Sequence, residues 1–142
     1  MNRTTDELMD ALLSKQDVQA YLEENAGEML SGTLAQQLAM LLQRHGLKKG
    51  AVIEAAQIER SYGYQLFPGR RDTPSRDVLL SLALAMRLSV DETQTLLRVS
   101  GLAMLYPRVR RDSVILHELA QGDSVMACNA RLEACGEPVL GD

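Results

Sequence analysis

The side chains best suited to recognising another molecule lie on one short stretch of the chain. They are Arg60, Ser61, Tyr64 and Gln65. Ile58, Tyr62 and Leu66 follow one another at intervals of four residues, which places these three on one face of a helix. We expect that face to be buried and the four polar side chains to be exposed. Arginine can hydrogen-bond guanine, and glutamine can hydrogen-bond adenine, in the DNA major groove. The exposed face is therefore predicted to contact bases.

Basic residues flank this stretch on both sides. They are Lys48, Lys49, Arg70 and Arg71. Residues 32–76 hold seven bases and three acids, a net charge of +4. Residues 1–31 hold seven acids and two bases (−5), and residues 77–142 hold nine acids and six bases (−3). A basic segment between acidic flanks indicates an anionic partner. We expect the four flanking side chains to bind the phosphates of double-stranded DNA.

The sequence holds little that could support catalysis. It has no glycine-rich phosphate loop and no nucleophile motif. Neither His45 nor His117 has a ligand three or four residues further on. We therefore predict no enzyme, no catalytic residues, no metal and no other cofactor. Cys128 and Cys135 would lie about 10 Å apart along a helix, so they are expected to be unpaired.

The elements that position these side chains are predicted to be helices. Leu, Ala and Met dominate the apolar residues and Trp is absent, which favours a helical bundle over sheets. Helices are expected over residues 4–13, 14–25, 33–45, 49–56, 60–67, 75–88, 89–100, 112–120 and 124–135. Pro68 is expected to push Phe67 out of helical geometry and so to end the helix over 60–67. The fold class is therefore predicted to be all-α, a compact helical bundle.

Several helix ends carry residues that favour capping. The expected N-caps are Ser14, Thr33, Ser75 and Ser89, and the expected C-cap is Gly46. Within the helix over 14–25, Val18, Tyr21 and Leu22 are expected to form one apolar stripe.

Part of the chain repeats at an offset of 35 residues. Eight identities fall within 26 positions, the clearest being Arg76-Asp77 with Arg111-Asp112 and Ser89-Val90 with Ser124-Val125. The repeated unit is predicted to be a helical hairpin, and two stacked hairpins would extend one core. Coincidence among helices rich in Leu and Ala is the alternative.

Targeting signals are not evident in the sequence. No apolar run reaches the roughly 18 residues that a membrane helix needs. The acidic, polar N-terminus is unlike a secretory signal. A cytoplasmic protein without a membrane partner is expected.

Three segments carry a likeness to a known family. They are Gly46-Leu47, Gly69-Arg70-Arg71 with Pro74-Ser75, and the series Leu79, Leu82-Ala83, Leu88-Ser89 and Asp91-Glu92. From Leu34 to about Gly101 the chain resembles the Xre, or lambda-repressor-like, helix-turn-helix family. The resemblance implies an all-helical core and a bacterial or phage-type transcriptional regulator. Such a regulator binds specific DNA sequences, often as a homodimer.

This likeness suggests three segments for the chain. An acidic N-terminal helical arm for packing or dimerisation spans 1–31, a helix-turn-helix domain spans 32–101, and a C-terminal helical hairpin spans 102–142. The sequence departs from the family at three positions. The family usually has Ala at Ile53, Gly at Gln57, and an apolar residue at Gly63.

Two other hypotheses stay open. The main alternative is a non-enzymatic protein-interaction adapter built on a degenerate helix-turn-helix fold, motivated by the net charge of −4 and by the hairpins outside the motif. Its candidate contact residues are Tyr62, Tyr64, Phe67 and Tyr106. A third hypothesis is regulation through phosphorylation of Thr4 or Thr5.

Overall fold

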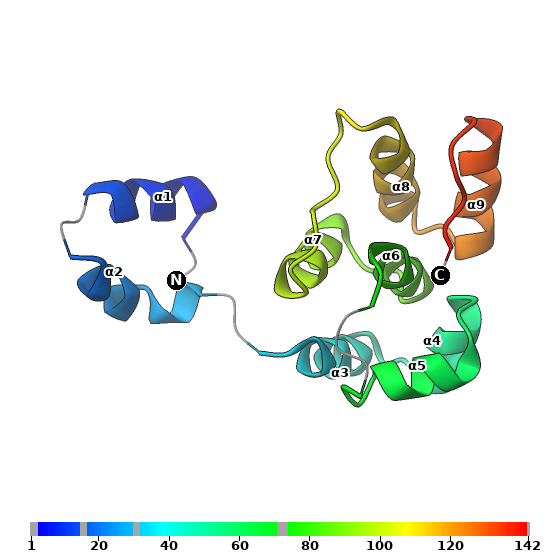
Figure 1. Cartoon of the computed structure of the whole chain (residues 1–142), viewed down its shortest axis with the longest axis horizontal. Coiled ribbons are helices and arrows are strands. Elements are labelled where there is room, and N and C mark those ends of the chain that lie inside the picture. Colours follow the sequence, from blue (N-terminus) through cyan, green and yellow to red (C-terminus); the bar gives the residue numbers. More distant parts are fainter. Residues whose placement is uncertain (1–2, 15–16, 30–31, 71–73, 142) are drawn as a thin grey trace. The chain divides into compact units, whose positions relative to one another are not determined.

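The computed structural model describes residues 3–14, 17–29, 32–70 and 74–141 (Figure 1). All regular secondary structure in these ranges is helical, which confirms the predicted all-α class. The chain forms two compact units, Met1–Ser31 and Gly32–Asp142.

The first unit is a pair of short helices, α1 (Thr5–Ser14) and α2 (Val18–Glu24), followed by a 3-10 turn, η1 (Ala26–Glu28). Asp17 caps α2, because its carboxylate accepts a hydrogen bond from the Gln19 N–H at 3.0 Å. The prediction that Ser14 caps this helix was wrong, because Ser14 is still the last residue of α1.

The apolar stripe expected on α2 is only partly buried. Tyr21 is buried, but the side chains of Val18 and Leu22 are 60% and 46% exposed. Two short helices have too little facing surface to cover every apolar residue.

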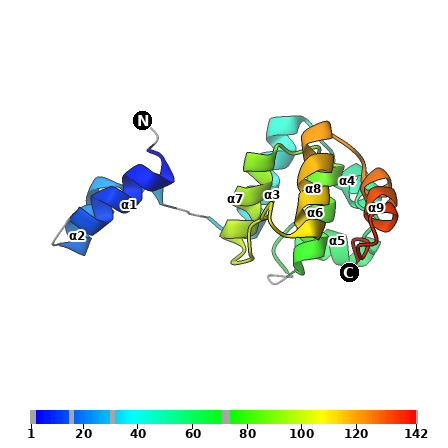
Figure 2. The same ribbon diagram turned by 90° about the horizontal axis from the view of Figure 1, so that it is seen from above.

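The second unit is a bundle of seven helices in the ranges that the structure describes. They are α3 (Leu34–His45), α4 (Lys49–Ala55), α5 (Arg60–Leu66), α6 (Arg76–Ala85), α7 (Val90–Val99), α8 (Arg110–Gln121) and α9 (Val125–Ala134). Helix α6 is central, since every residue from Val78 to Leu84 is buried. It packs against α4, α7, α8 and α9 (Figure 2).

Capping side chains fix where these helices begin. The Thr33 hydroxyl accepts the Gln36 N–H at 3.2 Å, and the Gln36 side chain accepts the Thr33 N–H at 2.9 Å. Ser89 and Glu92 make the same reciprocal pair, at 3.1 and 2.9 Å. Gly46 takes the left-handed conformation (φ 63°) after α3, so the expected cap at this end is confirmed.

The end of α5 differs from the prediction. Phe67 keeps helical angles (φ −61°, ψ −43°), so Pro68 does not displace it. The N–H groups of Gly69 and Arg70 bond to the carbonyls of Leu66 and Gln65, and Gly69 is left-handed (φ 89°). This hydrogen-bond pattern is a Schellman motif, so glycine two residues after Phe67 ends the helix.

Candidate functional site

The candidate site is built on α4, α5 and the turn between them. The turn is tight because Gln57 adopts a left-handed conformation, with φ 60°. A residue other than glycine adopts this conformation at a cost of about 1 kcal/mol. Ile58 then packs partly buried against the core. The turn therefore has the backbone shape that glycine would favour, although Gln57 occupies the position.

Helices α4 and α5 approach closely at Ile53 and Gly63. A Cβ atom on Gly63 would lie 2.7 Å from Cγ2 of Ile53, closer than side-chain atoms can pack. Both residues are buried. The two departures from the family pattern thus compensate each other, because the small residue needed at the contact stands on α5 and the large one on α4.

The structure places the predicted base-contacting residues on the outer side of α5. Arg60, Ser61 and Tyr64 are exposed and Gln65 is partly buried. Tyr62 is partly buried and packs against the core, as its spacing predicted.

Tyr64 lies beside two cations from different helices. The Nζ atom of Lys49 is 5.7 Å from the centre of its ring, and the guanidinium carbon of Arg60 is 5.8 Å from it. Next to this group is a hollow of about 470 Å3. Its lining residues are Gly50, Ile53, Glu54, Ile58, Arg60 and Tyr64.

The basic residues that flank α5 differ in position and in exposure. Lys48 is the exposed N-cap residue of α4, and Lys49 is partly buried. Arg70 is exposed after the end of α5. Arg71 lies outside the described residues. The structure therefore brings Lys49 and Arg60 to the ring of Tyr64, while Lys48 and Arg70 are at the two ends of the helix pair.

Two acids on the same helix pair were not singled out from the sequence. Glu54 lines the hollow, and Glu59 caps α5. The Glu59 carboxylate accepts the N–H groups of Tyr62 at 2.7 Å and Ser61 at 3.1 Å, and these bonds lower its pKa. The sequence feature that could have identified Glu59 is its position directly before the expected start of a helix, where a negative charge is favoured. These carboxylates reduce the positive charge of the site.

A second polar group joins α3 to α7. Glu92 accepts hydrogen bonds from Arg44 at 2.9 Å and from His45 at 3.0 Å. Partial burial acts to raise the pKa of Glu92, but the N–H of Ser89 and the side chains of His45 and Arg44 lower it to about 2. His45 is the last residue of α3, as expected, and its Nε2 atom lies 3.0 Å from a carboxylate oxygen of Glu92.

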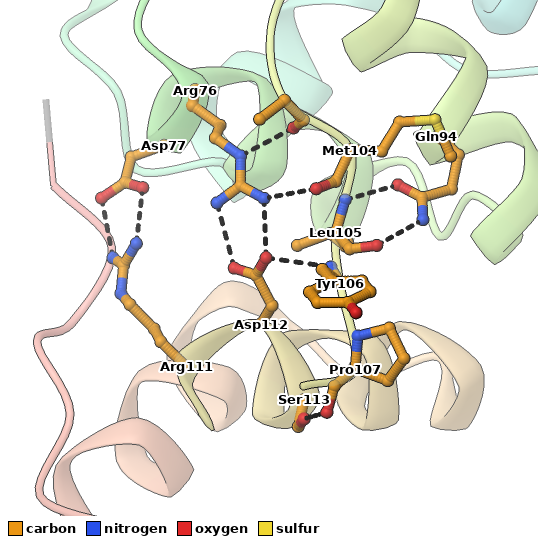
Figure 3. Close-up of polar contacts among 11 residues, drawn as sticks. Arg76, Asp77, Gln94, Met104, Leu105, Tyr106, Pro107, Arg111, Asp112 and Ser113 are labelled. Atoms are coloured by element: carbon orange, nitrogen blue, oxygen red, sulfur yellow. Dashed lines mark hydrogen bonds and ion pairs between the residues drawn. The ribbon is translucent and has the colours of Figure 1, made fainter. Parts of the chain in front are cut away.

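The repeated Arg-Asp dipeptides meet in the second unit (Figure 3). Arg76 donates to both carboxylate oxygens of Asp112, at 3.0 and 2.9 Å. It also donates to the carbonyls of Ala103 and Met104.

Arg111 makes the corresponding contacts in the opposite direction. It donates to both carboxylate oxygens of Asp77, at 2.9 and 2.8 Å, and to the carbonyls of Pro138 and Val139. Each of these partners is 35 residues from its counterpart, so the interactions repeat as well as the residues.

Metal-binding clusters and membrane-spanning helices were sought in the part of the chain that the structure describes. Among the described residues, no three His, Cys, Asp or Glu side chains gather as a metal site, and no helix is long and apolar enough to cross a membrane. Cys128 and Cys135 are both free thiols, as predicted. Comparison of the chain with protein-family models, curated proteins and solved structures gave no match.

Proposed function

We propose that this protein is a sequence-specific DNA-binding transcriptional regulator. Helices α4 and α5 form its helix-turn-helix, and α5 enters the major groove of double-stranded DNA. The observation that carries the proposal is the exposed face of α5, where Arg60 and Tyr64 lie together with Lys49.

The proposal gives the polar residues of this face distinct roles. Arg60, Ser61 and Gln65 contact base edges, and Lys48, Lys49, Arg70 and Arg71 contact phosphates. Tyr64, the fourth residue expected to contact bases, lies with Lys49 and Arg60 at its ring. The resemblance to the Xre family supports a bacterial or phage-type, cytoplasmic regulator that forms homodimers. In this proposal it has no enzymatic activity and needs no cofactor.

The proposal is tested by DNA binding at several salt concentrations. A duplex enriched from a random pool serves as the probe, and fluorescence anisotropy measures its affinity. Arg60→Ala combined with Gln65→Ala should weaken binding to this duplex by about tenfold or more, since each good base contact gives about 1–3 kcal/mol of discrimination. Binding to an unselected duplex should change much less.

Arg108→Ala is the matched control, because Arg108 is an exposed arginine outside the α4–α5 pair. It should leave the affinity for the selected duplex nearly unchanged. If the protein binds no duplex even at low salt, or if the double variant binds the selected duplex as the wild type does, the proposal is wrong.

The second candidate function is a protein-interaction adapter. It is favoured by the carboxylates of Glu54 and Glu59, which lie on the same helix pair as the cations. Tyr64 and Tyr106 are 40% and 53% exposed and suit such contacts, but Phe67 is buried and leaves the set of contact residues. Co-purification from the native host of a stoichiometric protein that requires Tyr64, with no DNA retained, would favour the adapter.

A further inference from the structure

Tyr64 is packed against three neighbours on the surface of the α4–α5 pair. Lys49 and Arg60 both lie within the roughly 6 Å of its ring centre at which cations are attracted to an aromatic face. The ring hydroxyl lies against Gly50, where a Cβ atom would be 2.7 Å from the hydroxyl oxygen. Because Gly50 has no side chain, the Tyr64 ring can lie against this part of α4.

The tyrosine connects cations that belong to different helices. Lys49 is the first residue of α4, and Arg60 is the first residue of α5, one turn before Tyr64. Lysine and arginine side chains have many rotamers, and ordering them on binding opposes association. A ring that attracts both cations orders them before any partner arrives.

We propose that Tyr64 is a positioning residue for DNA binding, which holds Lys49 towards the phosphates and Arg60 towards the bases. Its ring, and not its hydroxyl, carries this role. The inference rests on the proposed DNA-binding function, because the two ordered cations are taken to contact DNA.

Three variants separate the ring from the hydroxyl and from the charges. Tyr64→Phe keeps the ring, and Tyr64→Leu removes it. Gly50→Ala changes neither cation nor ring, but its Cβ must displace the tyrosine, and the neighbouring hollow gives the ring room to move. Alanine also favours a helix more than glycine does, so Gly50→Ala should unfold at the same temperature as the wild type or a higher one.

The first measurement needs no DNA. In the NMR spectrum of the full chain, ring currents should shift the side-chain CH2 protons of Lys49 and Arg60 away from their usual positions. We expect these shifts to persist in Tyr64→Phe and to be lost in Tyr64→Leu. Shifts that are absent from the wild type, or that survive in Tyr64→Leu, would overturn the positioning role.

The second measurement is affinity for the enriched duplex as a function of salt. Tyr64→Leu and Gly50→Ala should each bind about tenfold more weakly than the wild type, from the loss of two cation–ring contacts. The slope of log affinity against log salt should also fall by about 0.9 if the Lys49 phosphate contact is lost. Tyr64→Phe should bind within about twofold of the wild type.

The outcomes distinguish this inference from the function on which it rests. A wild-type chain that binds no duplex overturns both. If the wild type binds but Tyr64→Leu and Gly50→Ala bind equally well, only the positioning role is overturned. If Tyr64→Phe is as weak as Tyr64→Leu, DNA binding depends on the hydroxyl and the role of the ring is again rejected.

Discussion

At the scale of single residues, the geometry of the candidate site depends on Ile53 and Gly63. Each residue taken separately departs from the family pattern, and glycine inside a helix costs about 1 kcal/mol relative to alanine. Together they allow α4 and α5 to cross closely, since the Ile53 side chain fills the space that a Cβ on Gly63 would need. The cost in helix propensity is offset by a packed contact at this crossing.

The close fit of Gly63 against Ile53 predicts that alanine at position 63 will destabilise the protein, although alanine favours a helix more than glycine does. Gly63→Ala should lower the free energy of unfolding by about 1–2 kcal/mol, because the clash with Ile53 outweighs the better propensity of alanine. Urea denaturation measures the change. Gly27→Ala is the control, because a Cβ at Gly27 meets no atom within 4 Å and should have little effect.

A double variant tests whether the two residues are coupled. Ile53→Ala alone should cost about 2–5 kcal/mol through the cavity that it leaves. Adding Gly63→Ala should then cost less than it does in the wild type, by about 1 kcal/mol or more, because the clashing side chain is gone. Simple additivity of the two costs would contradict this account of the crossing.

At the scale of elements, Glu92 links two helices while capping one of them. Its carboxylate accepts the Ser89 N–H at the start of α7 and also pairs with Arg44 and His45 of α3. One charged side chain therefore fixes both where α7 begins and how α3 lies against it. Helix α7 also packs against α6, and α6 packs against α4 of the candidate site.

The ion pairs of Glu92 predict a pH dependence of stability. The pKa of Glu92 is about 2 in the folded protein against an ordinary value of 4.5, so folding favours the ionised form. The resulting stabilisation is fully present above about pH 4.5 and is lost as the pH falls towards 2. Glu92→Gln should therefore be less stable than the wild type at pH 7, and the difference should close over that range.

Thermal unfolding at a series of pH values measures this difference. Glutamine keeps a side-chain oxygen that can accept the Ser89 N–H, so the variant removes the charge more than the cap. Asp91→Asn makes the same charge change at the adjacent exposed residue and should have a smaller effect. A stability gap for Glu92→Gln that is constant between pH 7 and 2 would show that the ion pairs contribute nothing.

At the scale of the whole second unit, the sequence repeat corresponds to two helical hairpins, α6–α7 and α8–α9. Each hairpin makes the same kind of contact to the other. Asp112 accepts the Tyr106 N–H, and Asp77 accepts the Gly141 N–H. In both the acceptor and the donor, the two residues are 35 positions apart in the sequence. The segment that follows each hairpin is thus tied to an aspartate of the other. The two hairpins are related by their contacts as well as by their sequences.

The hairpins differ in what covers them. Leu82 of α6 and Met86, which directly follows α6, are buried, whereas their counterparts on α8, His117 and Gln121, are exposed. Polar residues on this face of α8 are compatible with water, so it needs no second set of covering helices.

The reciprocal contacts predict that lysine cannot replace either arginine. Arg111→Lys keeps the charge but cannot reproduce the two-point contact with Asp77 together with the carbonyl bonds. We expect a loss of about 1.5–3 kcal/mol in the free energy of unfolding. Hydrogen exchange of the Gly141 amide should also become faster, because Asp77 loses the partner that holds it in place.

Arg76→Lys is the matched variant in the other half. It should cause a similar loss and speed exchange at the Tyr106 amide instead. Arg108→Lys is the control, since Arg108 is an exposed arginine that lies before α8. Equal exchange at Tyr106 and Gly141 in all three variants would contradict the pairing.

The sequence by itself determined most of the local structure. The caps at Thr33, Ser75 and Ser89 and the C-cap at Gly46 are confirmed because capping depends on residues within about four positions of one another. Helix periodicity likewise placed Tyr62 and Leu66 inward and Arg60 outward. The predictions at Ser14 and Pro68 were wrong because competing local signals, at Asp17 and Gly69, decide those helix ends.

Only the tertiary structure decided which distant residues meet. The sequence showed that Arg76-Asp77 recurs as Arg111-Asp112, but not that each arginine pairs with the other copy's aspartate. It showed unusual residues at Ile53 and Gly63, but not that they touch, and it did not bring Lys49 to the ring of Tyr64. Such contacts depend on how helices cross and which rotamers the packing allows, and neither is encoded within a few neighbouring residues.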